Sequence, residues 1–326
     1  MRLLLIVNAS ASSVTARARV VIQKSLAADH QVTVAETSRR GHATRLAHSA
    51  ATKGTDVVVV LGGDGTLNEA ANGLAATPCA LGVLPGGSTN VFARTIGVTN
   101  DPIEATGQLL SALGAGPGGV RSVGLGSVNA RRFLFHAGIG FDAAVVAQVE
   151  RRTALKRHLG HAFFSYTALE TWARRFDRRQ PHFSVELHRG GGKEPVGVDD
   201  GYFAIILNTD PYTFLGERAF NLVPGTSLDT PLSAVVFRSV GAATLLAVAA
   251  AALVRDGGIG RHRKVAVVRD VTGGLVLSRA SGTGAGTVLS TAAAGVPYQA
   301  DGDYLGTVNR CELRWEPDAL RLVVPS

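Results

Sequence analysis

The residues best suited to chemistry form a glycine-rich segment, GGDGT, directly after a run of apolar residues. The surrounding sequence VVVVLGGDGTLNEAANGL, Val57–Leu74, predicts a buried strand, a glycine turn and then a helix. Glycines let backbone N–H groups approach a phosphate closely, and the start of a helix adds partial positive charge. An ordinary Asp-Gly turn usually joins two antiparallel strands, whereas a helical pattern follows here. The segment therefore predicts a phosphate-binding loop.

Two carboxylates belong to this segment. A carboxylate beside a polyphosphate is repulsive, so we expect Asp64 either to act through nucleotide-bound Mg²⁺ or to face the reacting group. As an exposed loop residue, Asp64 should contribute little to stability. Glu69 has two compatible interpretations: with Thr66 it forms a capping box for its own helix, or it contacts the ligand.

A second segment, LGVLPGGSTNVFART, Leu81–Thr95, repeats the order of strand, glycine turn and helix. Turns in successive strand–helix units should lie side by side at one edge of a parallel sheet, where α/β proteins bind ligands. Ser88 or Thr89 would either donate a hydroxyl group to a phosphate or cap the following helix.

A third segment, VPYQADGDYLG, Val296–Gly306, places Asp301 and Asp303 on either side of a glycine. A tight hairpin turn with solvated carboxylates is one interpretation. The other is catalytic, because a kinase acting on a hydroxyl group needs a carboxylate near the acceptor to take its proton.

Alternating strands and helices at the start of the sequence must position the two glycine turns. This alternation predicts an α/β domain with a parallel sheet and helices on both faces. The expected strands are 3–7, 31–34, 56–61 and 80–84, and the expected helices are 15–27, 42–52, 67–76 and 89–96.

The composition changes at GAGPGG, Gly114–Gly119, which predicts a linker between domains 1–119 and 120–326. Short strand-like segments then predict an antiparallel β-sandwich or barrel. They are 132–137, 182–187, 202–207, 233–237, 264–268, 274–277, 311–314 and 320–324, with helices expected at 143–151, 156–176 and 241–254. Whether the final segment, about 305–326, packs back on the first domain is left open.

Composition limits the class of protein. The 326 residues are 46% hydrophobic and carry a net charge of +8, which indicates a globular protein with an anionic partner. The first residues, MRLLLIVNAS, indicate a buried strand, not a secretory signal. The two cysteines fit no metal spacing, which indicates reduced thiols in a cytoplasmic protein. A 6% aromatic content without a nucleic-acid motif argues against nucleic-acid binding.

The motifs GGDGTLNE, PGGSTNVFAR, FHAGIGFDAAV and the late DGD, in that order, resemble the diacylglycerol kinase-like lipid kinase family. The resemblance covers essentially the whole chain. It implies an NAD kinase-like or phosphofructokinase-like α/β nucleotide domain, a C-terminal β-sandwich domain with the lipid site, and ATP with Mg²⁺. It implies that Asp303 is the general base, with Asp301 as the other candidate. The implied ATP contacts are Asn8, Ser10, Ser12, Thr37, Gly62, Gly63, Asp64, Gly65, Thr66, Asn68, Glu69, Gly87 and Ser88.

Several positions depart from the family pattern. The first loop reads NASAS where NPxSG is common, Val91 stands where an Asp often follows the Asn, and Asp303 replaces a more usual Glu. The stretch Val223–Asp229 lacks an acidic pair, so no structural Mg²⁺ is predicted there. Two alternatives stay open: an NAD kinase-like enzyme for a soluble metabolite, and a catalytically silent lipid-binding or regulatory protein.

The implied activity is ATP-dependent phosphoryl transfer to a lipid alcohol, diacylglycerol-like or sphingoid. Basic clusters at 151–157, 174–179 and 261–264 are either solvated faces or sites of transient contact with an anionic membrane. We therefore expect a cytoplasmic protein that is peripheral at the membrane, and a homodimer is left open.

Overall fold

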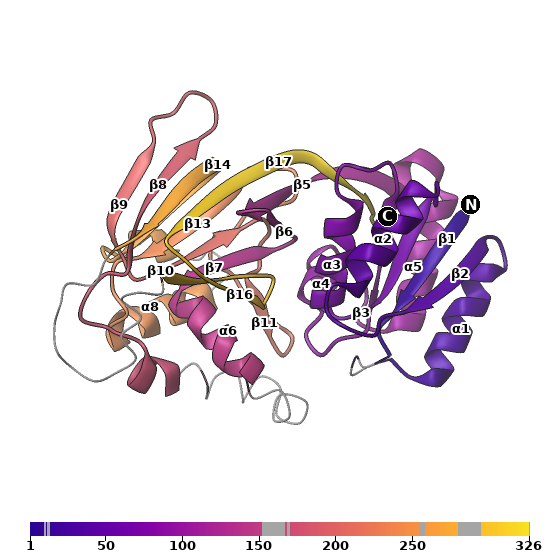
Figure 1. Ribbon diagram of the computed structural model, residues 1–326, viewed down its shortest axis with the longest axis horizontal. Helices are drawn as coiled ribbons and strands as arrows, with labels where there is room; N and C mark the ends of the chain where they lie inside the picture. Colours follow the sequence, from indigo (N-terminus) through magenta and orange to yellow (C-terminus); the bar gives the residue numbers. More distant parts are fainter. Residues whose placement is uncertain are drawn as a thin grey trace. The chain divides into compact units, whose positions relative to one another are not determined.

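The computed structural model describes residues 1–9, 11, 14–151, 167, 170–253, 258–279 and 295–325. The chain divides into two compact units, shown in Figure 1. Unit 1 comprises Met1–Leu125 and Pro317–Ser326, and unit 2 comprises Gly126–Glu316. The divisions fall inside strand β5 (Val120–Val128) and inside strand β17 (Arg310–Val323), so each of these strands contributes to both units.

Unit 1 contains a parallel sheet in the order β4-β3-β1-β2. Its central strand, β3, consists of consecutive apolar residues and is buried along its whole length, as expected for a strand covered on both faces. The strands are β1 (Arg2–Val7), β2 (Gln31–Glu36), β3 (Val57–Gly62) and β4 (Ala80–Pro85). The predicted α/β architecture is confirmed.

The helices of unit 1 follow the strands in the predicted order. They are α1 (Ala16–Ala27), α2 (His42–Thr52), α3 (Asp64–Leu74), α4 (Val91–Thr95) and α5 (Pro102–Gly114). Helix α3 begins three residues earlier than predicted, so Asp64 is in its first turn and not in a loop. Helix α5 was not predicted, although Asp101 caps it and Pro102 occupies its first position. The end of GAGPGG, Gly116–Gly119, forms a 3₁₀ helix.

The last residues of the chain complete the sheet of unit 1. Arg321 and Leu322 in β17 pair in parallel with Ala80 and Leu81 of β4. The backbone N–H of Val324 also donates to the carbonyl oxygen of Gly119, at 3.1 Å. The final segment therefore belongs to both units, because its earlier part pairs antiparallel with β14 in unit 2.

Unit 2 is built from antiparallel strands, as predicted. They include β6 (Arg131–Phe133), β7 (His136–Gly140), β8 (Phe183–Arg189), β9 (Val196–Gly201), β10 (Phe203–Leu207), β11 (Thr213–Leu215), β12 (Arg218–Phe220), β13 (Leu232–Phe237), β14 (Val265–Ser278), β15 (Val296–Ala300) and β16 (Asp303–Val308). Along β10, Ala204 and Ile206 enter one buried cluster, whereas Phe203, Ile205 and Leu207 enter another. Both faces of this part of the sheet are therefore buried.

Helices cover part of unit 2. The predicted helix at 143–151 is α6 (Phe141–Arg151), and the predicted helix at 241–254 is α8 (Ala242–Ala252). Of the predicted helix at 156–176, the structure describes a short π-helical segment, Thr171–Arg175, near its end, and residues 152–166, 168 and 169 lie outside the described residues. Among the residues that the structure describes, no helix is long and apolar enough to span a membrane.

Candidate functional site

The two glycine turns of unit 1 lie in direct backbone contact. The N–H of Gly86 donates to the carbonyl oxygen of Gly62 at 2.9 Å. A Cβ atom on Gly87 would lie 2.8 Å from the Cα of Gly63, and one on Gly86 would lie 2.9 Å from the Cα of Gly62. Only glycine allows this approach. The prediction that the turns lie side by side is therefore confirmed.

Helix α3 begins at Asp64, directly after the first of the two glycine turns. Its N-cap residue, Gly63, has no side chain that could accept from the first-turn amides. Backbone N–H groups at a helix start, next to glycines without Cβ atoms, are the donors that bind phosphate in proteins. This arrangement fits the polyphosphate of a nucleotide.

Asp64, the first residue of α3, holds the second turn. Its two carboxylate oxygens accept from the backbone N–H groups of Val91 and Phe92, at 3.0 and 3.1 Å, at the start of α4. Burial raises the pKa of this carboxyl group, and the two amides oppose that rise. The expectation of an exposed residue with little structural role is wrong. Each oxygen still keeps a lone pair that could face a cation.

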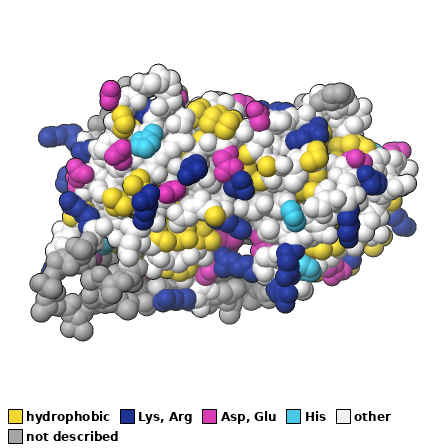
Figure 2. Space-filling model, turned by 45° about the horizontal axis from the view of Figure 1, so that its top comes forward, with side chains coloured by type: hydrophobic (Ala, Val, Ile, Leu, Met, Phe, Trp, Pro, Cys, Tyr) yellow, Lys and Arg dark blue, Asp and Glu magenta, His cyan; other side chains and the backbone are white. Residues whose placement is uncertain are grey.

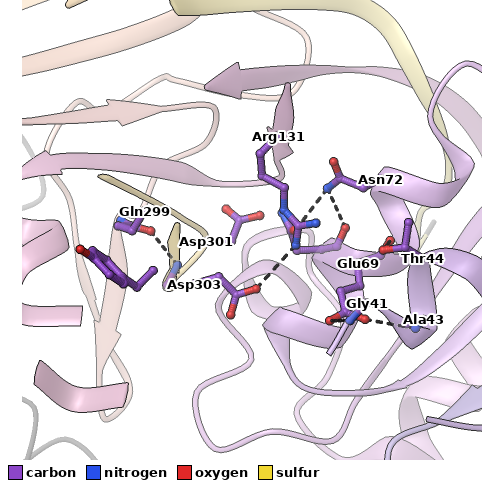
Figure 3. A network of polar contacts seen from close by, with 12 residues as sticks. Gly41, Ala43, Thr44, Glu69, Asn72, Arg131, Gln299, Asp301 and Asp303 are labelled. Atoms are coloured by element: carbon purple, nitrogen blue, oxygen red, sulfur yellow. Dashed lines mark hydrogen bonds and ion pairs between the residues drawn. The ribbon is translucent and has the colours of Figure 1, made fainter. Parts of the chain in front are cut away.

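Glu69 likewise holds the start of a helix, in this case α2 (Figure 3). Its oxygens accept from the backbone N–H groups of Gly41 and Ala43, at 2.7 and 3.1 Å, around the start of α2. The predicted capping box is not formed, because α3 already starts at Asp64. The hydroxyl oxygen of Thr66 instead accepts from the side-chain amide of Asn8, at 2.9 Å.

Several residues predicted to contact the nucleotide lie at the carboxyl edge of the sheet. Asn8 follows β1, Thr37 follows β2, and the glycine turns follow β3 and β4. The chain order reverses between β1 and β3, the kind of position where open α/β sheets bind ligands. Ser88 is exposed there, whereas Asn68 is fully buried within α3. Ser10 and Ser12 lie outside the described residues.

Neither Ser88 nor Thr89 is the N-cap residue of α4. That position belongs to Asn90, which has a left-handed backbone conformation. The side chain of Asn90 accepts from the N–H of Gly87 at 2.8 Å and donates to its carbonyl oxygen at 2.9 Å. Asn90 therefore fixes the shape of the second glycine turn and leaves the two hydroxyl groups out of the helix cap.

In unit 2, Asp301 is held inside the protein by three backbone amides. Its carboxylate accepts from the N–H groups of Leu134, Phe135 and His136, at 2.6, 3.0 and 3.1 Å, and only 5% of the residue is exposed. These bonds explain why the predicted single strand at 132–137 is divided into β6 and β7. The amides between the two strands bind a carboxylate instead of a neighbouring strand.

Asp303 is the more accessible carboxylate of the same turn. It starts β16, its side chain is 21% exposed, and the guanidinium group of Arg131 lies 3.6 Å away (Figure 3). The two acids of the DGD motif therefore differ: Asp301 supports the backbone, and Asp303 is available to solvent and ligands.

A buried network beside this turn was missed by the sequence analysis. The carboxylate of Asp142 accepts from the hydroxyl group of Tyr212 at 2.6 Å and from the side-chain amide of Gln299 at 2.7 Å. Burial and the adjacent carboxylate raise the pKa of Tyr212 well above its usual value. Burial lowers the pKa of His136, whose ring packs on that of Tyr212, to about 4. FHAGIGFD was the available signal, because it contains both His136 and Asp142.

An apolar pocket of about 180 Å³ lies next to the network within unit 2. Asp142 and Tyr212 are its polar lining residues, and α8 forms part of its wall. The apolar lining residues are Phe141, Val145, Phe203, Ile205, Phe220, Leu222, Phe237, Leu245, Val248 and Ala249. Such a lining suits a hydrocarbon chain better than a polar metabolite.

The described residues contain no cluster of three or more His, Cys, Asp or Glu that could hold a metal ion.

Comparisons with known proteins agree with this arrangement. Residues 2–115 match the family model of the diacylglycerol kinase catalytic domain. A probable lipid kinase, YegS-like, from Pseudomonas aeruginosa (strain UCBPP-PA14) is 30% identical over 70% of this chain and 78% of its own length. A diacylglycerol kinase from Bacillus subtilis (strain 168) is 34% identical over 46% of this chain, and the match spans 48% of that protein's length.

Solved structures from Bacillus anthracis str. Sterne share the fold. Two of them superimpose with TM-scores of 0.70 and 0.64, at 21% and 20% sequence identity. They cover 99% of this chain, and the chain covers 97% and 96% of them. The second is described as a diacylglycerol kinase.

Proposed function

Because the chain belongs to the diacylglycerol kinase-like lipid kinase family, we propose that it transfers the γ-phosphoryl group of ATP to the hydroxyl group of a lipid. The single observation that carries the proposal is the pair of glycine turns in backbone contact at the start of α3. The contact brings the two turns together beside the first backbone N–H groups of α3, which are the kind of donors that bind phosphate.

In this proposal, unit 1 binds ATP. The amides of Gly63, Gly65 and Thr66 hold the phosphates, while Asn8 and Ser88 contribute polar groups at the same edge of the sheet. Mg²⁺, when bound with the nucleotide, neutralises phosphate charge during transfer. Asp64 is the residue at these turns that faces such a cation, through the lone pairs its two hydrogen bonds leave free.

Unit 2 binds the lipid acceptor. The apolar pocket supports this assignment, because a hydrocarbon chain bound there would be removed from water. Each Å² of apolar surface buried in this way contributes roughly 25 cal/mol to the binding free energy. A diacylglycerol-like or sphingoid alcohol has the required chain and hydroxyl group. A soluble dinucleotide acceptor would leave this lining unused.

Asp303 accepts the proton of the lipid hydroxyl group. Asp301 is poorly suited to this role because it is buried and its carboxylate already accepts three amide hydrogen bonds. Asp303 is partly exposed, and the positive charge of Arg131 near it keeps the carboxylate in place.

The enzyme contacts anionic membranes through α8. The exposed side of this helix includes Leu246, 71% exposed, and the basic residues Arg238, Arg263 and Lys264 are exposed in the segments before and after it. On the face shown in Figure 2, Lys and Arg side chains are spread widely with acidic side chains among them. Helix α8 also lines the pocket, so the basic residues near it would bring the pocket close to an anionic membrane. We therefore base the docking proposal on these residues and not on the net charge of the whole protein.

The activity is tested with purified protein, radiolabelled ATP and Mg²⁺, and a mixed-lipid extract as acceptor. We expect label in the lipid phase. Parallel reactions with NAD and without acceptor serve as controls. Label in NAD phosphate would favour the soluble-metabolite kinase, and ATP binding without transfer to any acceptor would favour the silent lipid-binding protein.

A further inference from the structure

A continuous chain of buried and partly buried hydrogen bonds joins the apolar pocket to the DGD turn. The hydroxyl group of Tyr212 donates to Asp142 at 2.6 Å, and Asp142 accepts from the Nε2 of Gln299 at 2.7 Å. The Oε1 of Gln299 then accepts from the backbone N–H of Gly302 at 2.8 Å. Gln299 thus uses one end of its amide towards the pocket and the other towards the turn.

The middle of this chain, the bond between Asp142 and Gln299, is buried, whereas the bonds at its two ends are partly buried. Gln299 is completely buried, and only 7% of Asp142 is exposed. The space around the pair is full, because a Cβ atom on Gly138 would collide with an oxygen of Asp142 and lie 2.6 Å from Nε2 of Gln299. Gly138, the first of the two glycines in FHAGIGFD, is therefore required by this hydrogen-bond pair.

The chain ends at the residue between the two acids. Asp301 fixes one side of the turn by its three amide bonds. Gly302, with a positive φ of 80°, is held from the other side by Gln299. Asp303 comes next, so the position of its backbone depends on both restraints.

We propose that Gln299 is a positioning residue that makes turnover depend on what fills the apolar pocket. Tyr212 and Asp142 line that pocket and also begin the hydrogen-bond chain, which we call the Tyr212–Gln299 relay. A long hydrocarbon chain packed against them excludes water and holds the relay, whereas a short chain leaves that end hydrated. Discrimination between acceptors then appears in kcat, through the placement of Asp303. This inference rests on the proposed function.

The relay can be broken and restored without changing net charge. Gln299→Met keeps the volume and removes both hydrogen bonds. The double variant Asp142→Asn with Gln299→Glu exchanges the amide and the carboxylate, so the bonds to Tyr212, to each other and to Gly302 can all form again. Tyr212→Phe removes only the hydroxyl group at the pocket end.

Turnover is measured with dioleoylglycerol and dioctanoylglycerol in mixed micelles. Misplacing a catalytic group by about 1 Å costs on the order of 100-fold, so we expect Gln299→Met to lower kcat for dioleoylglycerol about 10-fold to 100-fold, with the KM for ATP little changed. The loss should be smaller for dioctanoylglycerol, and the exchanged pair should recover most of it. Tyr212→Phe should show the same dependence on chain length. Equal losses for both acceptors, or no recovery, would overturn the proposal.

Amide hydrogen exchange gives a readout that does not need phosphoryl transfer. In the wild-type protein, dioleoylglycerol micelles should slow exchange of the Gly302 amide, and Gln299→Met should abolish that protection. If the wild-type protein transfers phosphate to neither acceptor yet shows the protection, the proposed function fails while the relay stands. Exchange at Gly302 that is unaffected by dioleoylglycerol in the wild-type protein would refute the relay itself.

Discussion

The turn regions of the two units use the same device in different settings. In unit 1, Asp64 and Glu69 on one helix accept backbone amides at the starts of α4 and α2. In unit 2, Asp301 accepts three amides between β6 and β7. Each carboxylate fixes backbone that is distant in sequence, so both turns depend on buried charge.

The difference is in what surrounds the carboxylates. The turns of unit 1 are rich in glycines that touch through their backbones, and their amides are the proposed phosphate-binding groups. The turn of unit 2 adjoins an interior of interacting side chains, including Asp142, Gln299 and His136. We therefore expect unit 1 to depend on its glycines and on the carboxylates that hold its turns, and unit 2 to be sensitive to the chemistry of a larger set of buried side chains.

The largest effect should come from Asp303. General-base assistance is worth about 10²–10⁴-fold, so Asp303→Asn should lower kcat by about that factor with little change in the Kd for ATP. Asp303→Glu should keep substantial activity. The measurements are lipid phosphorylation and ATP binding for both variants. A normal turnover for Asp303→Asn together with an inactive, folded Asp301→Asn would move the base to Asp301.

The next effect concerns stability. Asp301→Ala leaves three buried amides without an acceptor, and we expect a loss of about 4 kcal/mol in the free energy of unfolding. Urea unfolding followed by circular dichroism measures it. Asp199→Ala, an exposed acid in β9 of the same unit, is the matched control and should be nearly neutral. Equal stability of the two variants would mean that the three bonds contribute little.

Asp64→Ala should have a smaller effect on stability than Asp301→Ala, because two amides lose their acceptor and water can reach this half-buried position. Loss of a helix cap costs about 1–2 kcal/mol. The same variant should also lose phosphoryl transfer, since the second turn and the cation-facing carboxylate change together. Asp29→Ala, exposed in the same unit, is the control. A folded Asp64→Ala protein with normal kcat would contradict the role assigned to this residue.

The buried residue His136 should make the stability of unit 2 decrease at acidic pH. His136 has a pKa lowered by burial to about 4, so it is neutral in the folded protein while the unfolded chain takes up a proton near pH 6.5. The resulting stability is complete above pH 6.5 and falls as the pH drops towards 4. One pKa unit corresponds to about 1.4 kcal/mol, so the loss between pH 6.5 and 5 should be about 2 kcal/mol.

The measurement is urea unfolding at pH 7 and pH 5. His136→Phe keeps an aromatic ring against Tyr212 and should reduce the difference between the two pH values. An undiminished difference in this variant would assign the acid sensitivity to other groups.

The smallest effect should be on membrane binding. The wild-type protein should sediment with vesicles rich in anionic lipid and weakly with neutral ones, and added salt should reduce binding. Leu246→Ser should weaken binding a few-fold, because one exposed leucine contributes about 1 kcal/mol. Val20→Ser, an exposed apolar residue on α1, is the control. Equal binding to both vesicle types would leave the basic residues as solvated faces.

The same contrast explains how much could be predicted. In unit 1, strand, turn and helix are adjacent in sequence, so GGDGT and PGGSTN revealed both the elements and their common edge. The hydrogen-bond partners of the carboxylates in unit 1 were not predicted. Glu69 accepts from Gly41, which is 28 residues away in the sequence, and no local pattern encodes that bond. The capping box was a plausible local pattern that a tertiary contact replaced.

In unit 2, the sequence predicted antiparallel strands and the DGD turn but not the buried network. Gln299 and Asp142 are separated by 157 residues, and their contact depends on β15 pairing with β7. That pairing places Gln299 opposite Gly138. The sequence alone does not explain why Gly138 must be a glycine, because the side chain of Gln299, which would lie 2.6 Å from its Cβ atom, comes from another strand.

The return of β17 to unit 1 has a consequence for synthesis on the ribosome. Residues 1–115 contain strands β1 to β4 and helices α1 to α5, yet the edge of β4 that does not pair with β3 lacks its partner until Arg321 and Leu322 have been made. Throughout translation of unit 2, the nascent chain therefore carries an open strand edge, which is a template for pairing with other chains. The edge is covered only after Arg321 and Leu322 have been translated, so a chain that terminates just before them should be prone to aggregation even though it contains both sets of motifs.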